Sequence, residues 1–193
     1  MASYLVTGAS RGIGLELTKQ LLELPVSQVG KVFAVTRSDS SAPLRDLVEK
    51  SPDRAVHITA SVDDTESVQR AARDVKAKLG TQGLDVLVNN AGQQAFAPGG
   101  TKTAPPEQLA HLFDVNVIGP HRVIAAFLPL LETGNQKKVI NVYVLVRVWE
   151  QHQGQARLIL ATVPRRWEQF HGPSNISVRP LRPTRYPRPH CTC

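Results

Sequence analysis

Short apolar runs rich in Val, Ile, Leu and Ala alternate along the first 142 residues with longer segments in which apolar residues recur every three or four positions. The short runs are typical of strands, and the longer periodicity is typical of amphipathic helices. The runs predict strands at 3–7, 31–36, 55–60, 84–89 and 138–142. The periodic segments predict helices at 12–24, 43–50, 64–79 and 105–131, the last of them long enough for two helices. This alternation predicts an α/β fold with a doubly wound parallel sheet whose strands are covered by helices on both faces.

The pattern ends abruptly after Val142, where Arg, Pro, Gln and His replace the regular alternation. Two fragments, 143–149 and 158–163, still suit strands, but the prolines that follow cannot continue a helix or a central strand. We therefore expect one domain over 1–142, with a sheet that is incomplete at its C-terminal end, and an irregular Arg/Pro-rich tail over 143–193.

The positive charge of the chain belongs to this tail. The whole chain has 23 Lys and Arg against 16 Asp and Glu, a formal net charge of +7. Residues 1–142 hold 15 of the basic and 14 of the acidic side chains, whereas 143–193 hold 8 Arg and 2 Glu. A basic tail can bind nucleic acid, but aromatic residues for base stacking are sparse, so this role is the weaker interpretation.

Length and composition set further limits. A chain of 193 residues suits one domain with a proper core. The longest apolar candidate, 123–131, contains a proline and falls short of the roughly 20 residues that a membrane helix needs. Because no secretory signal precedes the first strand, we expect a cytoplasmic protein without a membrane span. Cys191 and Cys193 fit no disulfide framework, and the six histidines show no metal-ligand spacing, so no metal site is predicted.

A glycine-rich turn, Thr7-Gly8-Ala9-Ser10-Arg11-Gly12-Ile13-Gly14, lies between the first strand and the first helix. Glycines at these places let the backbone reverse and approach a pyrophosphate closely. The free N–H groups and the positive dipole end of the following helix stabilise phosphate charge. Strand, glycine turn and helix in this order are the context that a dinucleotide-binding motif requires, and they predict a fold of the Rossmann type.

Two further motifs follow this turn. Asn89-Asn90-Ala91-Gly92 comes after the fourth predicted strand, and Asn116 lies in F-D-V-N-V-I-G before the fifth. In order and spacing, the three motifs resemble those of the short-chain dehydrogenase/reductase family over residues 3–142. The stretch Gly12-Ile13-Gly14-Leu15-Glu16-Leu17 is most similar to its small carbonyl-reductase-like branch, often found in microbial secondary metabolism. The resemblance implies an oxidoreductase that reduces a carbonyl or oxidises an alcohol with a nicotinamide cofactor.

The resemblance also implies which residues hold the phosphates of the cofactor. The phosphate turn would be formed and lined by Gly8, Ser10, Arg11, Gly12, Ile13 and Gly14. After the second strand, an acidic side chain would select NAD by accepting bonds from a free 2′-hydroxyl. This chain has Thr36, Arg37 and Ser38 there, which together with Arg11 favour NADP(H), because guanidinium groups suit its 2′-phosphate. The alternative is that Arg37 is a solvated surface charge.

The adenosine side matches the family less closely. The family usually has an Asp at the end of the third strand, where this chain has Ser61 followed two residues later by Asp63. Asn90 would lie along the ribose, or it is a structural amide that bridges two strands. Arg122 would reach the cofactor side, or it is an exposed helix residue.

For catalysis the resemblance implies an Asn, a Ser and a Tyr-x-x-x-Lys pair, and only the first of these is present, as Asn116. Tyr143 and Val144 stand where the Ser is expected, and residues 143–193 contain no lysine. The Tyr would act as general acid or base, which contributes about 10²–10⁴ in rate. We therefore expect a chain that is inactive as its sequence stands.

Two interpretations of the C-terminal part stay open. In one, the chain is a non-catalytic cofactor-binding or partner-binding protein that uses its basic tail for interaction. In the other, the sequence after position 142 reflects an unspliced intron or a shifted reading frame, which would explain the lost lysines and the missing catalytic set together. Either way, the fifth strand and apolar surface near Asn116 lack a covering helix, which predicts self-association.

Overall fold

The centre of the fold is a parallel five-stranded sheet in the computed structural model, which describes residues 1–94 and 103–143. The strands are β1 (Ala2–Thr7), β2 (Val29–Thr36), β3 (Ala55–Thr59), β4 (Val86–Asn89) and β5 (Lys138–Asn141). They lie in the order β3-β2-β1-β4-β5. The chain therefore builds from β1 to β3 and then crosses to β4 on the other side of β1. This reversal leaves a crevice between the carboxyl ends of β1 and β4, where ligands bind in open α/β sheets.

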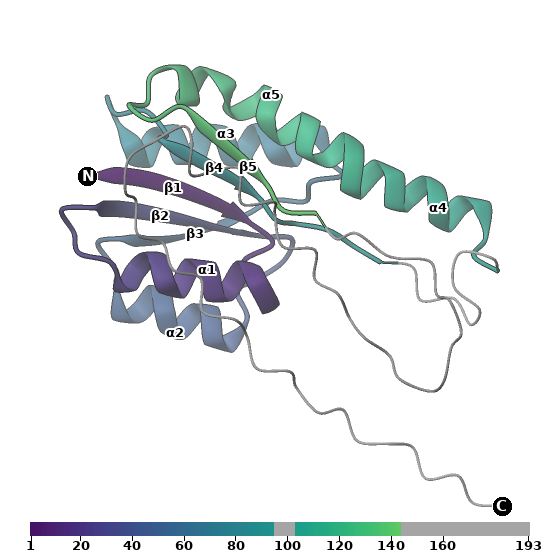
Figure 1. Cartoon of the computed structure of the whole chain (residues 1–193), viewed down its shortest axis with the longest axis horizontal. Coiled ribbons are helices and arrows are strands. Elements are labelled where there is room, and N and C mark those ends of the chain that lie inside the picture. Colours follow the sequence, from purple (N-terminus) through teal and green to yellow (C-terminus); the bar gives the residue numbers. More distant parts are fainter. Residues whose placement is uncertain (95–102, 144–193) are drawn as a thin grey trace, which may run out of the picture. The chain divides into compact units, whose positions relative to one another are not determined.

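Helices cover both faces of the sheet (Figure 1). In chain order they are α1 (Gly12–Glu23), α2 (Ala42–Lys50), α3 (Thr65–Leu79), α4 (Pro106–Phe113), the π-helical turn η2 (Asp114–Ile118) and α5 (Gly119–Glu132). α1 and α2 lie on one face and α3 and α5 on the other, while α4 extends beyond the carboxyl ends of the strands. None of the described helices is long and apolar enough to cross a bilayer. The predicted fold class, a Rossmann-type sheet wound on both sides, is confirmed.

Two apolar layers hold the helices to the sheet. They are separate because successive residues of a strand point to opposite faces. Leu5 and Leu87 belong to the layer under α3 and α5, whereas Val6 and Val88 belong to the layer under α1. Neighbouring residues of β1 and β4 thus pack in different layers, so both faces of these two strands are buried.

The two ends of α3 show why helices begin and end where they do. Asp64 is the N-cap, and its side chain accepts a hydrogen bond of 2.9 Å from the backbone N–H of Glu66. Gly80 ends the helix with a φ of 64°, a left-handed value that glycine adopts without steric cost.

The segment 105–131 forms two helices, as its length suggested, and η2 joins α4 to α5 without a loop between them. The general expectation of strands covered on both faces does not hold for β5. Val139 and Ile140 are 40% and 39% exposed, and β5 is the edge of the described sheet. This exposure agrees with the expectation that the fifth strand lacks a covering helix.

Candidate functional site

The glycine turn joins the carboxyl end of β1 to the first residue of α1. The N-cap position of α1 is Arg11, which makes no side-chain capping bond, and the first turn of the helix contains no acidic residue. The helix therefore begins with backbone N–H groups that its own side chains leave available, at the positive end of its dipole. Such an end suits a phosphate group.

Two glycines show that this turn fits a closely approaching ligand. Gly12 has a φ of 59°, and a side chain there would point into open space, so the residue is required by its backbone conformation. Gly14 is required for a steric reason instead, because a Cβ there would collide with the carbonyl of Gly8 and the side-chain amide of Asn90. The first turn of α1 thus packs directly on the end of β1, as a phosphate cradle requires.

Thr7 and Asn90 tie the end of β1 to the end of β4. The Thr7 hydroxyl accepts 3.0 Å hydrogen bonds from the backbone N–H groups of Asn90 and Ala91. The Asn90 amide in turn donates to the carbonyls of Thr7, at 2.9 Å, and Gly8, at 3.3 Å. Asn90 is therefore a structural bridge between two strands, one of its two expected roles, and its contact with a ribose stays a prediction.

The turn after β2 lies beside the glycine turn. Ala9 N–H donates to the carbonyl of Val35 at 3.0 Å, and the Ser41 hydroxyl donates to the carbonyl of Ser10 at 2.6 Å. Both bonds hold the phosphate turn against the segment that carries Arg37, whose side chain is exposed. The structure thus brings the two predicted parts of the NADP(H) site together.

Thr36 is buried at the end of β2, and its hydroxyl connects two polar groups. It lies 2.5 Å from the carbonyl oxygen of Ser38 and 2.6 Å from Nε2 of His57 in β3. The sequence analysis assigned no role to His57, because a lone histidine in a strand carries no motif. The contact depends on strand pairing, since His57 in β3 pairs with Ala34 in β2, two residues before Thr36.

The loop after β3 carries Ser61 and Asp63, whose side chains are hydrogen-bonded to each other. This bond lowers the pKa of the Asp63 carboxyl below its ordinary value, and the nearby charges of His111 and Arg37 act in the same direction against the effect of burial. The bond to Ser61 therefore favours the carboxylate form of Asp63. A contact of Ser61 or Asp63 with adenine stays a prediction.

Asn116 lies in the π-helical turn η2, and its side chain forms two hydrogen bonds with the backbone that follows the Asn89–Gly92 motif. Its Nδ2 donates to the carbonyl of Gln93 at 2.8 Å, and its Oδ1 accepts from the Gln93 N–H at 2.9 Å. The Gln93 side chain lies 3.2 Å from Nε2 of His111 in α4. Asn116 thus joins η2 to the loop after β4. Gln93 was missed by the sequence analysis, although it directly follows the Asn89–Gly92 motif.

Arg122 connects η2 to the loop after β3. Its guanidinium forms an ion pair of 2.7 Å with Asp114 and donates to the carbonyl of Val62 at 3.4 Å. Gly119 also faces Val62, whose side chain would lie 3.2 Å from a Cβ at that glycine. Arg122 is therefore partly buried and held by protein groups, not exposed on its helix, and its contact with a cofactor stays a prediction.

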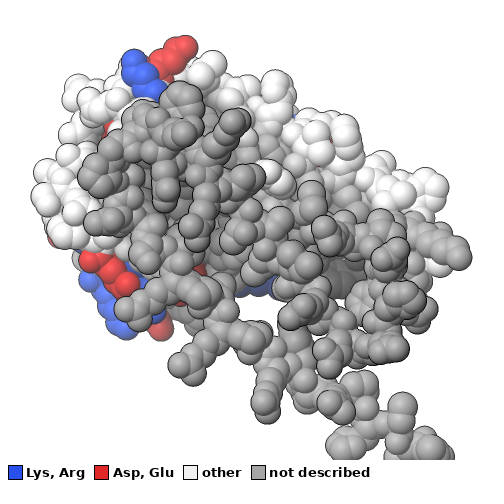
Figure 2. All heavy atoms as spheres, viewed as in Figure 1, with Lys and Arg blue, Asp and Glu red and all other residues white. Residues whose placement is uncertain are grey.

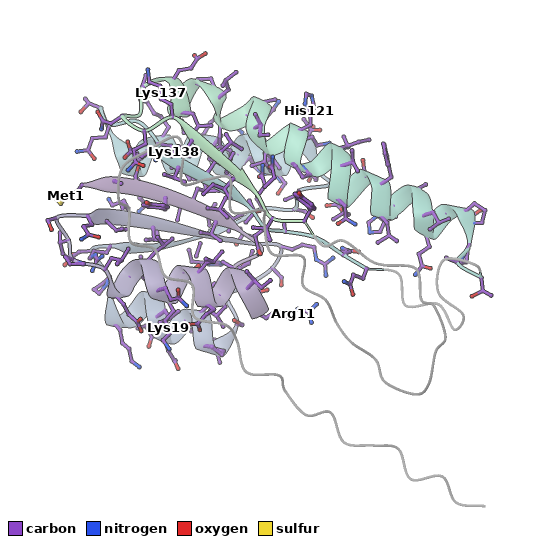
Figure 3. All side chains as sticks on the ribbon, viewed as in Figure 1. Met1, Arg11, Lys19, His121, Lys137 and Lys138 are labelled. Atoms are coloured by element: carbon purple, nitrogen blue, oxygen red, sulfur yellow. The ribbon has the colours of Figure 1, made fainter. Side chains whose placement is uncertain are left out.

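The basic side chains of the described residues lie at different ends of the sheet. Arg11 lies at the N-terminal end of α1, beside the carboxyl ends of the strands, whereas Lys137 and Lys138 lie at the opposite end of the sheet (Figure 3). On the face shown in Figure 2, most visible Lys and Arg side chains lie next to Asp and Glu. Arg11 at the start of α1 and Arg37 after β2 each bring a guanidinium group to the end of the sheet where the strands finish.

The carboxyl end of β5 is where the family pattern would place the catalytic Ser. Asn89 Nδ2 donates to Oδ1 of Asn141 at 2.9 Å, and Val142 N–H donates to the carbonyl of Asn89 at 2.8 Å. The next residue, Tyr143, is exposed. Residues 144–193, on which the remaining tail predictions fall, lie outside the described residues.

Comparison with known proteins is consistent with this geometry. A family model described as short chain dehydrogenase matches residues 3–151. Short-chain dehydrogenase/reductase AacuF of Aspergillus aculeatus is 36% identical over 153 residues, which cover 76% of this chain and 55% of that protein. Short-chain dehydrogenase/reductase atnB of an Arthrinium species is 35% identical over 150 residues, which cover 74% of this chain and 54% of that protein.

Solved structures give the same result. The NADPH-bound carbonyl reductase from chicken fatty liver superposes with a TM-score of 0.61 at 33% identity, over 69% of this chain and 49% of that one. The carbonyl reductase Sniffer of D. melanogaster has a TM-score of 0.63 at 28% identity, over 69% and 53% of the two chains. The chain thus spans about half the length of the relatives that it matches.

Proposed function

The chain belongs to the short-chain dehydrogenase/reductase family, and on this premise we propose that residues 1–142 form an NADP(H)-binding module of an oxidoreductase for a carbonyl or an alcohol. The nicotinamide cofactor of this family supplies the hydride that is exchanged with the substrate. The chain's own residues would bind the phosphates of the cofactor, through the glycine turn and the turn after β2.

The phosphate turn supports the binding part of this proposal. The uncapped start of α1 and the open space at Gly12 suit the pyrophosphate. Thr7 and Asn90 hold this turn rigidly against β4, so little ordering of the protein is needed when a ligand enters.

The preference for NADP(H) rests on the turn after β2. Arg37 stands where an acidic residue would repel a 2′-phosphate, and the bond between Ser41 and Ser10 keeps this turn beside Arg11. Two guanidinium groups near one site favour the dianionic phosphate over a hydroxyl. This placement of Arg37 is the single observation that carries the proposed cofactor preference.

We also propose that the chain as its sequence stands does not turn over substrate. Asn116 is bonded through both side-chain atoms to Gln93, so it positions the loop after β4, and its carboxamide does not titrate and cannot act as the general acid. The Tyr-x-x-x-Lys pair that the family resemblance implies as general acid and its partner is absent from residues 143–193, which contain no lysine. The division at position 142, a role in secondary metabolism and a cytoplasmic location stay predictions, of which the second is supported by fungal relatives.

A binding titration of the full chain tests the proposal. NADPH binding is measured by calorimetry or by nicotinamide fluorescence, with NADH in a parallel titration. We expect NADPH to bind more tightly, and Arg37→Ala to raise the NADPH Kd about tenfold or more while leaving the NADH Kd nearly unchanged. Arg73→Ala in α3 is the matched control, because it removes the same charge away from the turn. Equal affinity for both cofactors in the unaltered chain would contradict the NADP(H) preference.

A further inference from the structure

The buried hydroxyl of Thr36 has two short polar contacts that one proton cannot satisfy alone. Thr36 is 2% exposed, so water is not available to replace either partner. Its Oγ1 lies 2.5 Å from the Ser38 carbonyl and 2.6 Å from Nε2 of His57. A threonine hydroxyl has one hydrogen to donate and two lone pairs to accept.

Counting protons assigns the direction of both bonds. The Ser38 carbonyl can only accept, so the Thr36 hydroxyl must donate to it. The contact with His57 is then a hydrogen bond only if Nε2 carries a hydrogen and donates to Thr36. Burial lowers the pKa of the His57 imidazole, against an opposite effect of Asp39, so a neutral ring with its proton on Nε2 satisfies both contacts.

These two hydrogen bonds hold the turn after β2, which has few other hydrogen bonds to that strand. The carbonyl of Thr36 accepts a 2.8 Å bond from the Ala60 N–H and is thereby fixed to the segment after β3. β2 ends at Thr36, and the next three residues follow without strand pairing. The Thr36 side chain therefore holds the carbonyl of Ser38 at the point where the ladder stops, with Arg37 between the two bonded residues.

We propose that His57 is a positioning residue for recognition of the 2′-phosphate. It donates to Thr36, which donates to the carbonyl of Ser38, and this relay keeps that carbonyl turned inward and Arg37 directed to the site. The inference rests on the proposed NADP(H) binding and extends it to a residue in β3 that does not touch the cofactor. Its effect is expected only on the part of the cofactor that distinguishes NADPH from NADH.

Four variants of the full chain test this relay, each titrated with NADPH and with NADH. Thr36→Val removes both bonds at nearly constant volume, and we expect it to raise the NADPH Kd about five- to tenfold with the NADH Kd within about twofold. His57→Phe removes the first donor alone, and a rise of about threefold is expected. Thr36→Ser and His57→Gln keep the hydroxyl and an N–H donor, so both should retain the NADPH preference.

The outcomes separate this inference from the proposed function. If the unaltered chain does not prefer NADPH, the proposed cofactor preference fails and the relay fails with it. If the chain prefers NADPH but Thr36→Val and His57→Phe keep the same ratio of the two Kd values, only the relay is overturned. It is also overturned if Thr36→Ser and His57→Gln lose the preference as fully as the other two variants. A variant with a lower Tm that binds NADPH and NADH with equally reduced affinity would indicate a purely structural role. That result would also overturn the relay.

Discussion

The junction between β1 and β4 and the edge formed by β5 are built from the same sheet, but they differ in how completely the described residues close them. At the junction, five hydrogen bonds that involve the side chains of Thr7 and Asn90 join the carboxyl ends of β1 and β4. At the edge, Val139 and Ile140 of β5 remain exposed, and no further strand pairs with β5 within residues 1–94 and 103–143.

Exposed apolar side chains are also present at the end of α4 and in η2. Phe113 at the end of α4 and Val117 in η2 are 57% and 53% exposed. A monomer seldom leaves such side chains open near an unpaired strand. On the proposed function, the described residues supply the phosphate side of the site, and we expect the nicotinamide and substrate side to need residues outside 1–94 and 103–143 or another molecule.

Asp85 connects the two regions at the opposite end of the sheet, and its removal should have the largest effect. One carboxylate oxygen accepts from Ser3 in β1, and the other accepts from the N–H groups of Asn135, at 2.7 Å, and Gln136, at 3.2 Å, before β5. Asp85→Ala leaves these donors without partners, and we expect the free energy of unfolding to fall by about 3–5 kcal/mol. Denaturant titration measures this loss, and Asp85→Asn, which keeps one acceptor oxygen, should lose about half as much.

The pH dependence of stability checks that the charge of Asp85 is responsible. Burial raises the pKa of its carboxyl, but the hydrogen bonds from Ser3, Asn135 and Gln136 outweigh this and leave the pKa below its ordinary value. Because the folded-state pKa is the lower one, the contribution is complete above the ordinary pKa of about 4 and is lost as the pH falls through the folded value. As the pH is lowered from 6 to 2, the free energy of unfolding should therefore fall more steeply for the unaltered chain than for Asp85→Asn. Parallel curves would show that the charge is unimportant.

Gly14→Ala should break the closed junction, with a smaller effect on stability and a large effect on binding. The new Cβ would press on the Gly8 carbonyl and the Asn90 amide, which are held in place by Thr7. Overpacking of this kind costs about 1–3 kcal/mol, so the NADPH Kd should rise about 10- to 100-fold. Gly30→Ala is the control, because its Cβ meets only the side chain of the terminal Met1. Unchanged affinity in Gly14→Ala would show that this turn does not hold the cofactor.

The smallest effect is expected at the open edge. Ile140→Lys places a charge on β5, and edge lysines discourage pairing between strands of different molecules. We expect the unaltered chain to self-associate and the variant to shift toward the monomer in sedimentation velocity, with no change in NADPH affinity. Val26→Lys introduces the same charge at an exposed residue away from β5 and should leave association unchanged. If both variants associate as the unaltered chain does, the edge is not the contact surface.

The parts of the site that follow from local pattern could be predicted, and those that depend on contacts between distant side chains could not. Strand, glycine turn and helix are adjacent in sequence, so Gly12 and Gly14 could be recognised from the local pattern. The hydrogen bonds between Asn116 and Gln93 form only when η2 meets the loop after β4. The contact of His57 with Thr36 forms only when β3 pairs with β2. The apolar run of β5 alone does not show its exposure, because such a run looks the same at an edge and in a centre; the exposure was predicted from the missing covering helix.

The π-helical turn has a consequence for the spacing of residues along its helix. An α-helix advances by about 100° per residue, and a π turn contains one residue more than the α-helix it interrupts. The wider turn takes up this extra residue, so α4 and α5 keep the angular phase that they would have in one regular helix. Deleting one residue from Asp114–Ile118 would restore an α-helical turn and leave Val123 and Phe127 in the core. What would change is the turn itself, where Asn116 is held against Gln93. The extra residue thus lets the helix present Asn116 to the loop after β4 without changing the phase of the residues that pack under α5.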